Sequence, residues 1–165
     1  MAQLYSINLI KESRYEIMSV IKIKRTEAAK RFPMMKIAKD GDAGYDLPAC
    51  LPDGPIVIEP QTRGIIPTGI HLELPVGWWA SIEARSSTSK YMLICPKGVI
   101  DEGYRGELFA VLINVGREPV TINDGDRFVQ LIPHKRMSYE TIIMEVDELS
   151  PSERGDSGFG STGRR

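Results

Sequence analysis

A lone carboxylate, Asp101, follows the apolar pair Val99 and Ile100 and precedes the aromatic Tyr104, which has a glycine close by on either side. This pattern predicts a β-hairpin whose turn brings an acid and a flat ring together. A carboxylate in such a turn can act as a general base, and the ring can stack on a sugar or a base. The alternative is an aspartate that only caps its own loop.

A second segment suited to chemistry is the glycine-rich stretch RGDSGFGSTG at residues 154–163. Its glycines leave the backbone free to present consecutive N–H groups. Arg154 adds a planar cation, and Ser161 and Thr162 add hydroxyls, so the stretch can cradle a phosphate. Phe159, the one aromatic within it, can stack on a base. The alternative is a disordered tail, because the stretch is too polar to form a core.

Period-two alternation of apolar residues predicts the strands that must position these groups. Strands are expected at 21–24, 70–74, 78–85, 107–114, 120–122, 128–132 and 141–146. The run 107–114 is apolar on both faces, as in a strand covered on both sides. Turn residues separate the strands at 53–55, 75–77 and 123–125. Many short strands at this spacing predict an all-β barrel or jelly roll, with weak helical signals only in the first ~30 residues.

The bulk composition limits the possible partners. The chain has 165 residues, which fits one domain, and 42% of them are hydrophobic, enough to bury a core. Its net charge of -1 provides no overall field for nucleic acid or membrane, so local arginines must hold any anionic ligand. No apolar run reaches the about 20 residues that span a bilayer. Two cysteines, Cys50 and Cys95, make neither a disulfide framework nor a zinc site and indicate reduced thiols in an intracellular, cytoplasmic protein.

Five segments together resemble the five motifs of the trimeric dUTPase family, in order and at about the family's spacing. They are AGYDLPA (43–49), ARSS (84–87), GVIDEGYRGEL (98–108), GDRFVQLI (125–132) and RGDSGFGSTG (154–163). Each alone would be weak, but the joint match is specific and spans most of the chain. The resemblance implies a dUTPase-like distorted jelly roll, or β-clip barrel, at 19–149. It also implies a flexible Gly-rich C-terminal arm at 150–165 that closes over the substrate, and an N-terminal extension at 1–18.

The resemblance further implies a homotrimer with active sites at the subunit interfaces, which hydrolyses dUTP to dUMP and pyrophosphate with Mg²⁺. This dUTP diphosphatase reaction limits uracil incorporation into DNA and supplies dUMP for dTMP synthesis. Asp101 would activate the water that attacks the α-phosphorus, with Gln130 near the α-phosphate. Tyr104 would pack beneath the deoxyribose, and Asp46 would help to hold the Mg²⁺-bound triphosphate through water. The implied substrate-binding residues are Arg85, Ser86, Ser87, Cys95, Gly98, Val99, Ile100, Tyr104, Arg154, Phe159, Gly160, Ser161 and Thr162.

Three features depart from the family's usual pattern, and they concern the side-chain part of uracil recognition. Ser87 stands where a glycine is common, and the stretch from Ser87 to Cys95 is shorter than in many members. Cys95 occupies a position where many members carry an asparagine that touches uracil. The backbone around Gly98 and Ile100 would read the uracil edge without such a side chain.

Two alternatives remain open. The sister family, dCTP deaminase, shares the fold but needs a catalytic glutamate ten residues after the aspartate. That position here is Val111, which cannot transfer a proton, and the sister family tends to have Trp where Tyr104 stands. The other alternative is a dUTPase-fold regulator that binds a protein partner, for which residues 1–18 could serve.

Overall fold

The computed structural model describes residues 19–136, 143–146, 148 and 150, so the extension expected at 1–18 and nearly all of the arm expected at 150–165 lie outside them. Within the described residues the chain is all-β, as predicted, with two short 3-10 helices. The elements are β1 Lys22–Arg25, η1 Ala28–Arg31, β2 Tyr45–Leu47, β3 Ile56–Ile58, β4 Arg63–Glu73, β5 Trp78–Ala84, η2 Thr88–Tyr91, β6 Leu93–Ile94, β7 Gly98–Ile100, β8 Glu107–Asn114, β9 Val120–Ile122 and β10 Val129–Lys135. No helix in this part of the chain is long and apolar enough to cross a membrane.

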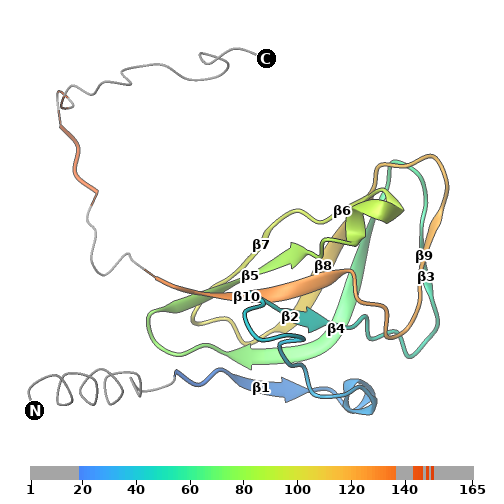
Figure 1. Cartoon of the computed structure of the whole chain (residues 1–165), viewed down its shortest axis with the longest axis horizontal. Coiled ribbons are helices and arrows are strands. Elements are labelled where there is room, and N and C mark those ends of the chain that lie inside the picture. Colours follow the sequence, from blue (N-terminus) through green and yellow to red (C-terminus); the bar gives the residue numbers. More distant parts are fainter. Residues whose placement is uncertain (1–18, 137–142, 147, 149, 151–165) are drawn as a thin grey trace, which may run out of the picture.

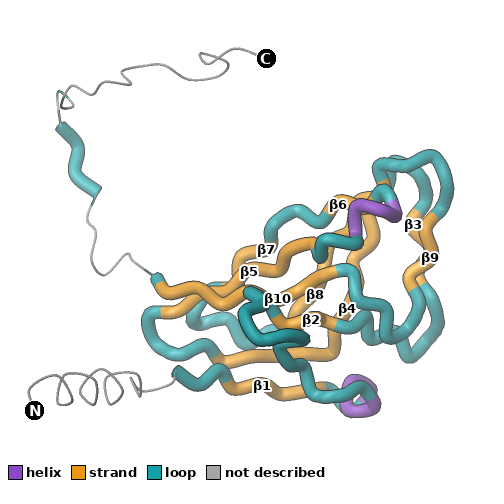
Figure 2. Tube along the Cα trace, in the orientation of Figure 1, coloured by secondary structure: helices purple, strands orange, loops and turns teal. Residues whose placement is uncertain are grey.

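Two four-stranded sheets form the body of the molecule (Figure 1). One has the order β1-β4-β8-β6 and the other the order β2-β10-β5-β7, and all of their pairs are antiparallel. β3 and β9 form a separate two-stranded sheet, which Figure 2 shows at one end of the molecule. Neighbours in each sheet are distant in sequence, as in a jelly roll, and the predicted jelly-roll-like fold is confirmed.

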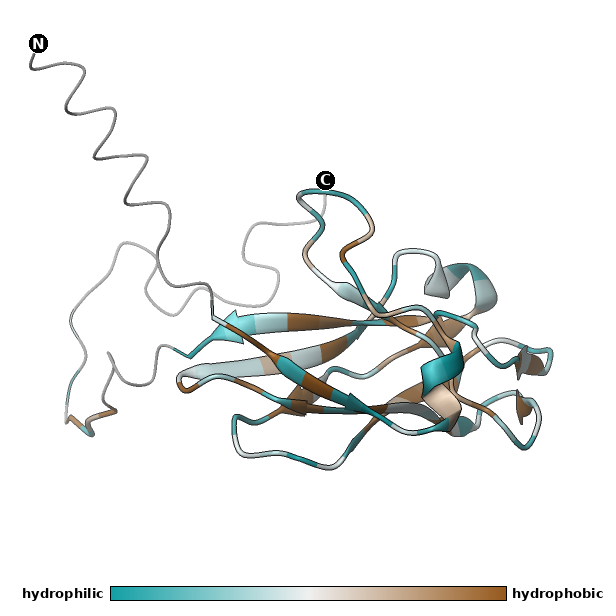
Figure 3. Cartoon of the chain, turned by 90° about the horizontal axis from the view of Figure 1, so that it is seen from below, coloured by the Kyte–Doolittle hydropathy of each residue, from teal (hydrophilic) through white to brown (hydrophobic). Residues whose placement is uncertain are grey.

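Alternation along the strands gives each sheet a core face and an outer face. On β8, Leu108, Ala110 and Leu112 are buried, and on β5 Ala80 and Ile82 are buried in the same way. The hydropathy colouring of Figure 3 alternates along the strands accordingly. Each fully buried leucine or isoleucine stabilises the fold by roughly 1.5–3 kcal/mol relative to an exposed one, so the core holds the two sheets together.

Glycines in the left-handed region make the three predicted turns. Gly54 has φ +118°, Gly77 has φ +80° and Gly125 has φ +83°. Residues with a Cβ rarely adopt these angles, which explains why each turn carries a glycine. The turns expected at 53–55, 75–77 and 123–125 are therefore confirmed.

The strand expected at 128–132 is present as β10, which begins at Val129 and continues to Lys135. Two expectations about strands were wrong. The run 98–108 is not a hairpin, because β7 pairs with β5 in one sheet whereas β8 pairs with β4 and β6 in the other. Residues 143–146, the described end of the strand expected at 141–146, form no strand. Periodicity reports which face of a segment is apolar, but not which neighbour will pair with it.

β8 is buried on only one face in the single chain. Its outer residues Phe109, Val111 and Ile113 alternate with the buried ones, and Phe109 is 45% exposed. Ile65 on the adjacent β4 is 54% exposed. We call these four residues the apolar outer face. The expectation that 107–114 is covered on both sides is not met within one chain.

Candidate functional site

Four side chains at one end of the second sheet form a cluster that we call the arginine cluster: Asp46, Arg85, Arg127 and Gln130. β10 lies between β2 and β5, with Gln130 opposite Asp46 on one side and Glu83 on the other. Arg85 directly follows β5, and Arg127 lies two residues before β10. This register brings together three of the five motif segments.

Asp46 joins the two arginines. Its Oδ1 lies 2.7 Å from Arg85 Nε, and its Oδ2 lies 3.3 Å from Arg127 Nη1. Arg85 Nη1 also donates to the carbonyl oxygen of Arg127 at 2.9 Å. The Asp46 side chain is only 18% exposed whereas that of Arg127 is 57% exposed. The cluster is therefore fixed from within, while a guanidinium stays open to an anion from solvent.

Gln130 is held in place by the backbone and by close packing. Its Nε2 donates to the carbonyl oxygen of Ala84 at 3.1 Å. A Cβ added at Gly44 would lie 2.5 Å from Gln130 Oε1, so a glycine at 44 leaves the amide its space. The first motif thus contributes close packing as well as its aspartate.

The sequence prediction omitted Arg127, although it lies inside the motif segment 125–132. An arginine just before a strand is ordinarily a solvated residue. Its role becomes visible only when the register places it beside Asp46, 81 positions earlier.

Ser86 and Ser87 lie between Arg85 and η2. Arg85 accepts a hydrogen bond from the Thr88 amide at 3.0 Å through its carbonyl oxygen, which closes the turn. Ser87 has φ -80°, so no glycine is required at this position. Ser86 is exposed and Ser87 is partly buried.

The second region is the Asp101 turn, residues 101–104, which follows β7. The Tyr104 amide donates to the Asp101 carbonyl oxygen at 3.0 Å, and the Tyr104 hydroxyl donates to the Glu107 carbonyl oxygen at 2.8 Å. The predicted turn with its ring is thus present, although not as a hairpin. Asp101 is exposed, and among the described residues its carboxylate has no hydrogen bond and no ion pair.

β7 carries the other residues predicted for this region. Gly98, Val99 and Ile100 pair with β5 on one side only, because β7 is an edge strand. Ile100 turns into the core, whereas Val99 is 60% exposed. Cys95 is half-buried, and burial raises the pKa of its thiol to about 11, with a smaller contribution from Glu83.

The structure does not bring all of the predicted residues together in one chain. Ile100 lies opposite Ala80, so Asp101 is level with Trp79, six residues from Arg85 along β5. At about 3.3 Å per residue, roughly 20 Å separates the Asp101 turn from the arginine cluster. Arg154, Phe159, Gly160, Ser161 and Thr162 lie outside the described residues.

The donor set fits a metal ion that arrives with its ligand rather than one held by the protein. No group of three or more potential metal-ligating side chains occurs among the described residues. Asp46 is the acid of the arginine cluster, and both of its oxygens already face guanidinium groups. Mg²⁺ commonly keeps several waters and binds through substrate phosphates, which is compatible with a single acid reached through water.

Comparison with known proteins identifies the family. The profile of the dUTPase family matches residues 30–163. The deoxyuridine 5'-triphosphate nucleotidohydrolase of Caldanaerobacter subterraneus subsp. tengcongensis is 42% identical over 147 residues, covering 87% of this chain and 97% of the relative. The enzyme of the same name from Beijerinckia indica subsp. indica is 40% identical over 147 residues, covering 87% and 91%.

Solved structures agree. The Staphylococcus bacteriophage 80alpha dUTPase with dUpNHpp is 26% identical, with a TM-score of 0.71 over 88% of this chain and 99% of that one. A variant dUTPase from phage phi11 of S. aureus, whose structure details the coordination of a structural Mg(II) ion, has a TM-score of 0.63 and 23% identity over 84% and 99%, and shows the fold alone. The chain belongs to the dUTPase family.

Proposed function

We propose that this chain is a dUTP diphosphatase, which hydrolyses dUTP to dUMP and pyrophosphate. One observation carries the proposal: the sheet β2-β10-β5-β7 bears an anion-binding arginine cluster near one end of β5 and an exposed carboxylate, Asp101, in the turn after β7 near the other end. The names of its relatives and the dUpNHpp held by the phage 80alpha protein support the substrate. The reaction would limit uracil incorporation into DNA and supply dUMP for dTMP synthesis.

In this proposal the arginine cluster binds the triphosphate. Phosphoryl transfer requires positioning and charge stabilisation more than covalent chemistry, and Arg85 and Arg127 supply fixed positive charge. Gln130 donates near the α-phosphate, and Ser86 and Ser87 add hydroxyls. Because the guanidiniums are already oriented by Asp46, little reorganisation is needed when the substrate arrives.

Asp101 holds and activates the attacking water. Its carboxylate has no partner among the described residues and is free to accept a proton from water. The ring of Tyr104 is fixed by its hydroxyl on the Glu107 carbonyl, so it presents a rigid floor beneath the deoxyribose. A rigid floor leaves no space for a ribose 2′-hydroxyl.

The free edge of β7 reads the base. One edge of this strand pairs with β5, so the outward N–H and C=O groups of Gly98, Val99 and Ile100 can pair with uracil as with another strand. Cys95 supplies packing in this arrangement, because a thiol is only a weak donor.

Mg²⁺ bound to the triphosphate would neutralise charge on the phosphate oxygens. Asp46 would reach it through water, since its own oxygens face Arg85 and Arg127. The chain's contribution is to orient the triphosphate from the arginine side, with no direct protein ligand required.

The active assembly is a homotrimer. Two observations support it: about 20 Å separates the Asp101 turn from the arginine cluster within one chain, and the apolar outer face of β8 and β4 is uncovered. Further copies of the chain would bury that face, and sites at the subunit interfaces would combine the Asp101 turn of one copy with the arginine cluster of another.

The remaining parts of the chain complete the proposal. Residues 19–149 form the catalytic domain, and residues 150–165 form an arm that closes over the substrate, with Arg154, Ser161 and Thr162 on the γ-phosphate, Phe159 on uracil and Gly160 giving the backbone its freedom. Residues 1–18 are an extension available to a regulatory protein partner. Free Cys50 and Cys95 favour action in the cytoplasm. Val111 disfavours deamination of dCTP, because it cannot transfer a proton.

The test is pyrophosphate release from dUTP, dCTP, dTTP and UTP in parallel, with and without Mg²⁺. Rapid, Mg²⁺-dependent release from dUTP alone is expected, because the other three differ by an amino group, a methyl group or a 2′-hydroxyl. Release from none of them would overturn the proposal, and ammonia release from dCTP would then indicate the deaminase alternative.

A further inference from the structure

The turn at residues 123–126, between β9 and β10, controls where Arg127 lies. It is joined to the loop after β2 by two backbone hydrogen bonds, from the Gly125 amide to the Ala49 carbonyl and from the Ala49 amide to the Asp126 carbonyl, both at 2.8 Å. Arg127 follows at once, with its side chain on Asp46 and its carbonyl on Arg85. A shift of this turn would therefore move half of the arginine cluster.

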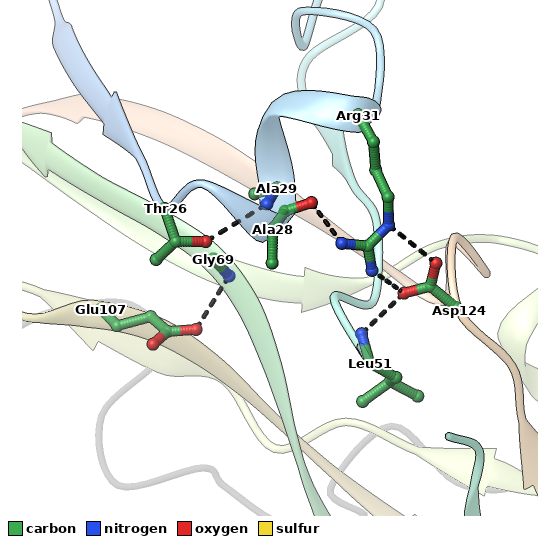
Figure 4. Close-up of polar contacts among 8 residues, drawn as sticks. All are labelled: Thr26, Ala28, Ala29, Arg31, Leu51, Gly69, Glu107 and Asp124. Carbon is green, nitrogen blue, oxygen red and sulfur yellow. Dashed lines mark hydrogen bonds and ion pairs between the residues drawn. The ribbon is translucent and has the colours of Figure 1, made fainter. Parts of the chain in front are cut away.

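The Arg31 side chain, near the beginning of the domain, binds this turn through Asp124 (Figure 4). Arg31 of η1 contacts Asp124 with two nitrogens, Nε to Oδ2 at 3.1 Å and Nη2 to Oδ1 at 2.5 Å. Asp124 Oδ1 also accepts the Leu51 amide at 2.7 Å. Asp124 thus joins η1, the loop after β2 and the turn itself, across 93 positions of sequence.

Arg31 itself is pre-oriented. Its Nη1 donates to the Ala28 carbonyl of its own turn, and its guanidinium lies 4.6 Å from the centroid of the Phe32 ring. The Phe32 ring in turn packs against the 123–126 turn, since a Cβ added at Gly125 would lie 3.3 Å from it. A guanidinium fixed in this way has less freedom to lose on pairing than a lysine would have.

η1 is itself held in place by hydrogen bonds and close packing. The Thr26 amide donates to the Gly69 carbonyl at 2.8 Å, and the Ala29 amide donates to Thr26 Oγ1 at 3.2 Å. Gly69 itself donates to Glu107 Oε1 at 2.8 Å, and it has no room for a side chain, because a Cβ would lie 2.6 Å from that of Ala29 (Figure 4). η1 therefore connects the bulge of β4 to the 123–126 turn.

We infer that Arg31 and Asp124 are positioning residues for the triphosphate: they hold the 123–126 turn so that Arg127 and Arg85 meet the phosphates in one fixed arrangement. The inference rests on the proposed function. Neither residue belongs to the arginine cluster, so both act through the turn. An exposed ion pair contributes little to global stability, whereas a small displacement of a binding group has a large effect on the substrate.

The experiment compares Arg31→Gln, Asp124→Asn and their double variant with wild type in steady-state dUTP hydrolysis. Asp124→Asn retains a carbonyl oxygen for the Leu51 amide, so it removes the ion pair and little else. The matched control is Lys30→Gln, which breaks the exposed Lys30–Glu27 pair on the same η1 without touching the turn.

Each single variant is expected to raise KM for dUTP about 10-fold while kcat changes less than about threefold, because phosphate contacts weaken while the Asp101 turn is untouched. The double variant is expected to be no worse than either single one, since both remove the same contact. Arg31→Lys should recover only part of the loss. A purely structural role would instead lower kcat at unchanged KM, through a smaller folded fraction, and that result, or a KM equal to that of Lys30→Gln, would overturn the inference.

Binding of inorganic tripolyphosphate, measured by calorimetry on the same proteins, separates this inference from the proposed function. If wild type does not hydrolyse dUTP but binds tripolyphosphate about 10-fold more tightly than Arg31→Gln does, the positioning role stands and the proposed reaction fails. Equal binding by wild type and Arg31→Gln, or binding by neither, removes the positioning role.

Discussion

The two ends of β5 hold charge in opposite ways. At one end the arginine cluster is closed on itself, with Asp46 between two guanidiniums and Arg85 also bonded to the backbone at Arg127. At the other end the Asp101 carboxylate is exposed and has no partner among the described residues. The Asp101 turn is attached to its sheet through a three-residue edge strand, β7.

The difference fits the roles proposed for the two ends. Groups that bind a fixed charge act best when they are oriented before the ligand arrives. A general base must instead keep an oxygen accessible to water. A partner that held this oxygen in place would also prevent it from accepting the proton. In the proposed function, the chain thus fixes its cations and leaves Asp101, the proposed base, without a partner among the described residues.

The largest expected effect comes from removing the free base. Asp101→Asn is expected to lower kcat for dUTP about 1,000-fold and to leave KM within about threefold, because the amide still fits but cannot accept the proton. Steady-state kinetics measures both, with Asp53→Asn in a distant exposed turn as the control. Activity within tenfold of wild type would show that Asp101 is not the general base, and the proposed contrast between the two ends would then fail.

The next effect tests whether the two ends meet across chains. Arg85→Gln and Asp101→Asn, each nearly inactive alone, are mixed, unfolded and refolded together. If sites form between subunits, random assembly leaves about one quarter of them with both groups intact, so about a quarter of wild-type activity should return. No recovery above the sum of the separately refolded variants would indicate that each chain builds its own site.

The Cys95 thiol tests how apolar the surroundings of β7 are. With a pKa raised from 9.0 to about 11 by burial and Glu83, its thiolate is about 100-fold scarcer at pH 8 than that of an ordinary cysteine. Alkylation by iodoacetamide, followed by peptide mass spectrometry, should be slower at Cys95 than in the urea-unfolded protein by about that factor. Because the folded protein holds this proton more tightly, the thiol contributes to stability below pH 9. This contribution is lost as the pH rises through 11. Equal rates in the folded and unfolded protein would show an open, polar environment.

The smallest effect concerns the ion pair that braces the arginine end. The hydrogen bond from Arg31 has the largest effect on Asp124 and lowers its pKa below 3.8. The hydrogen bond from the Leu51 amide also lowers the pKa, whereas desolvation raises it. A lowered carboxyl pKa stabilises the folded protein above that value, and the contribution disappears as the pH falls through the folded pKa. Asp124→Asn should lower Tm by no more than about 2–4 °C at pH 6, and this difference should shrink as the pH falls below 3.8. A Tm difference that persists at low pH would show that the ion pair is not its source.

Local patterns predicted much of the fold. The runs 107–114 and 120–122 match β8 and β9 residue for residue, because alternation is a property of the segment itself. β2, β3 and β6 are equally short or shorter and were not predicted. The first half of β4 was not predicted, because it contains Gly64, Pro67 and Gly69, which are rare in strands. The strand bulges between Pro67 and His71.

The site was harder to predict where it depends on pairing between distant segments. The motifs indicated Asp46, Arg85 and Gln130, but the contact of Arg127 with Asp46 requires the register of β2 on β10, which no local signal contains. The same limit produced the wrong hairpin at 98–108. Arg31 and Asp124 belong to none of the five motif segments, and only their distance in the folded chain reveals them.

The uncovered apolar outer face has a consequence for how the protein behaves on dilution. In the proposed trimer, burial of Phe109 and Ile65 is complete only when three chains associate, so the folded state becomes a concentration-dependent species. Melting temperature should then rise with protein concentration, and specific activity should decline at high dilution. The number of chains in a cell would thus set both how much enzyme is present and what fraction of it can act.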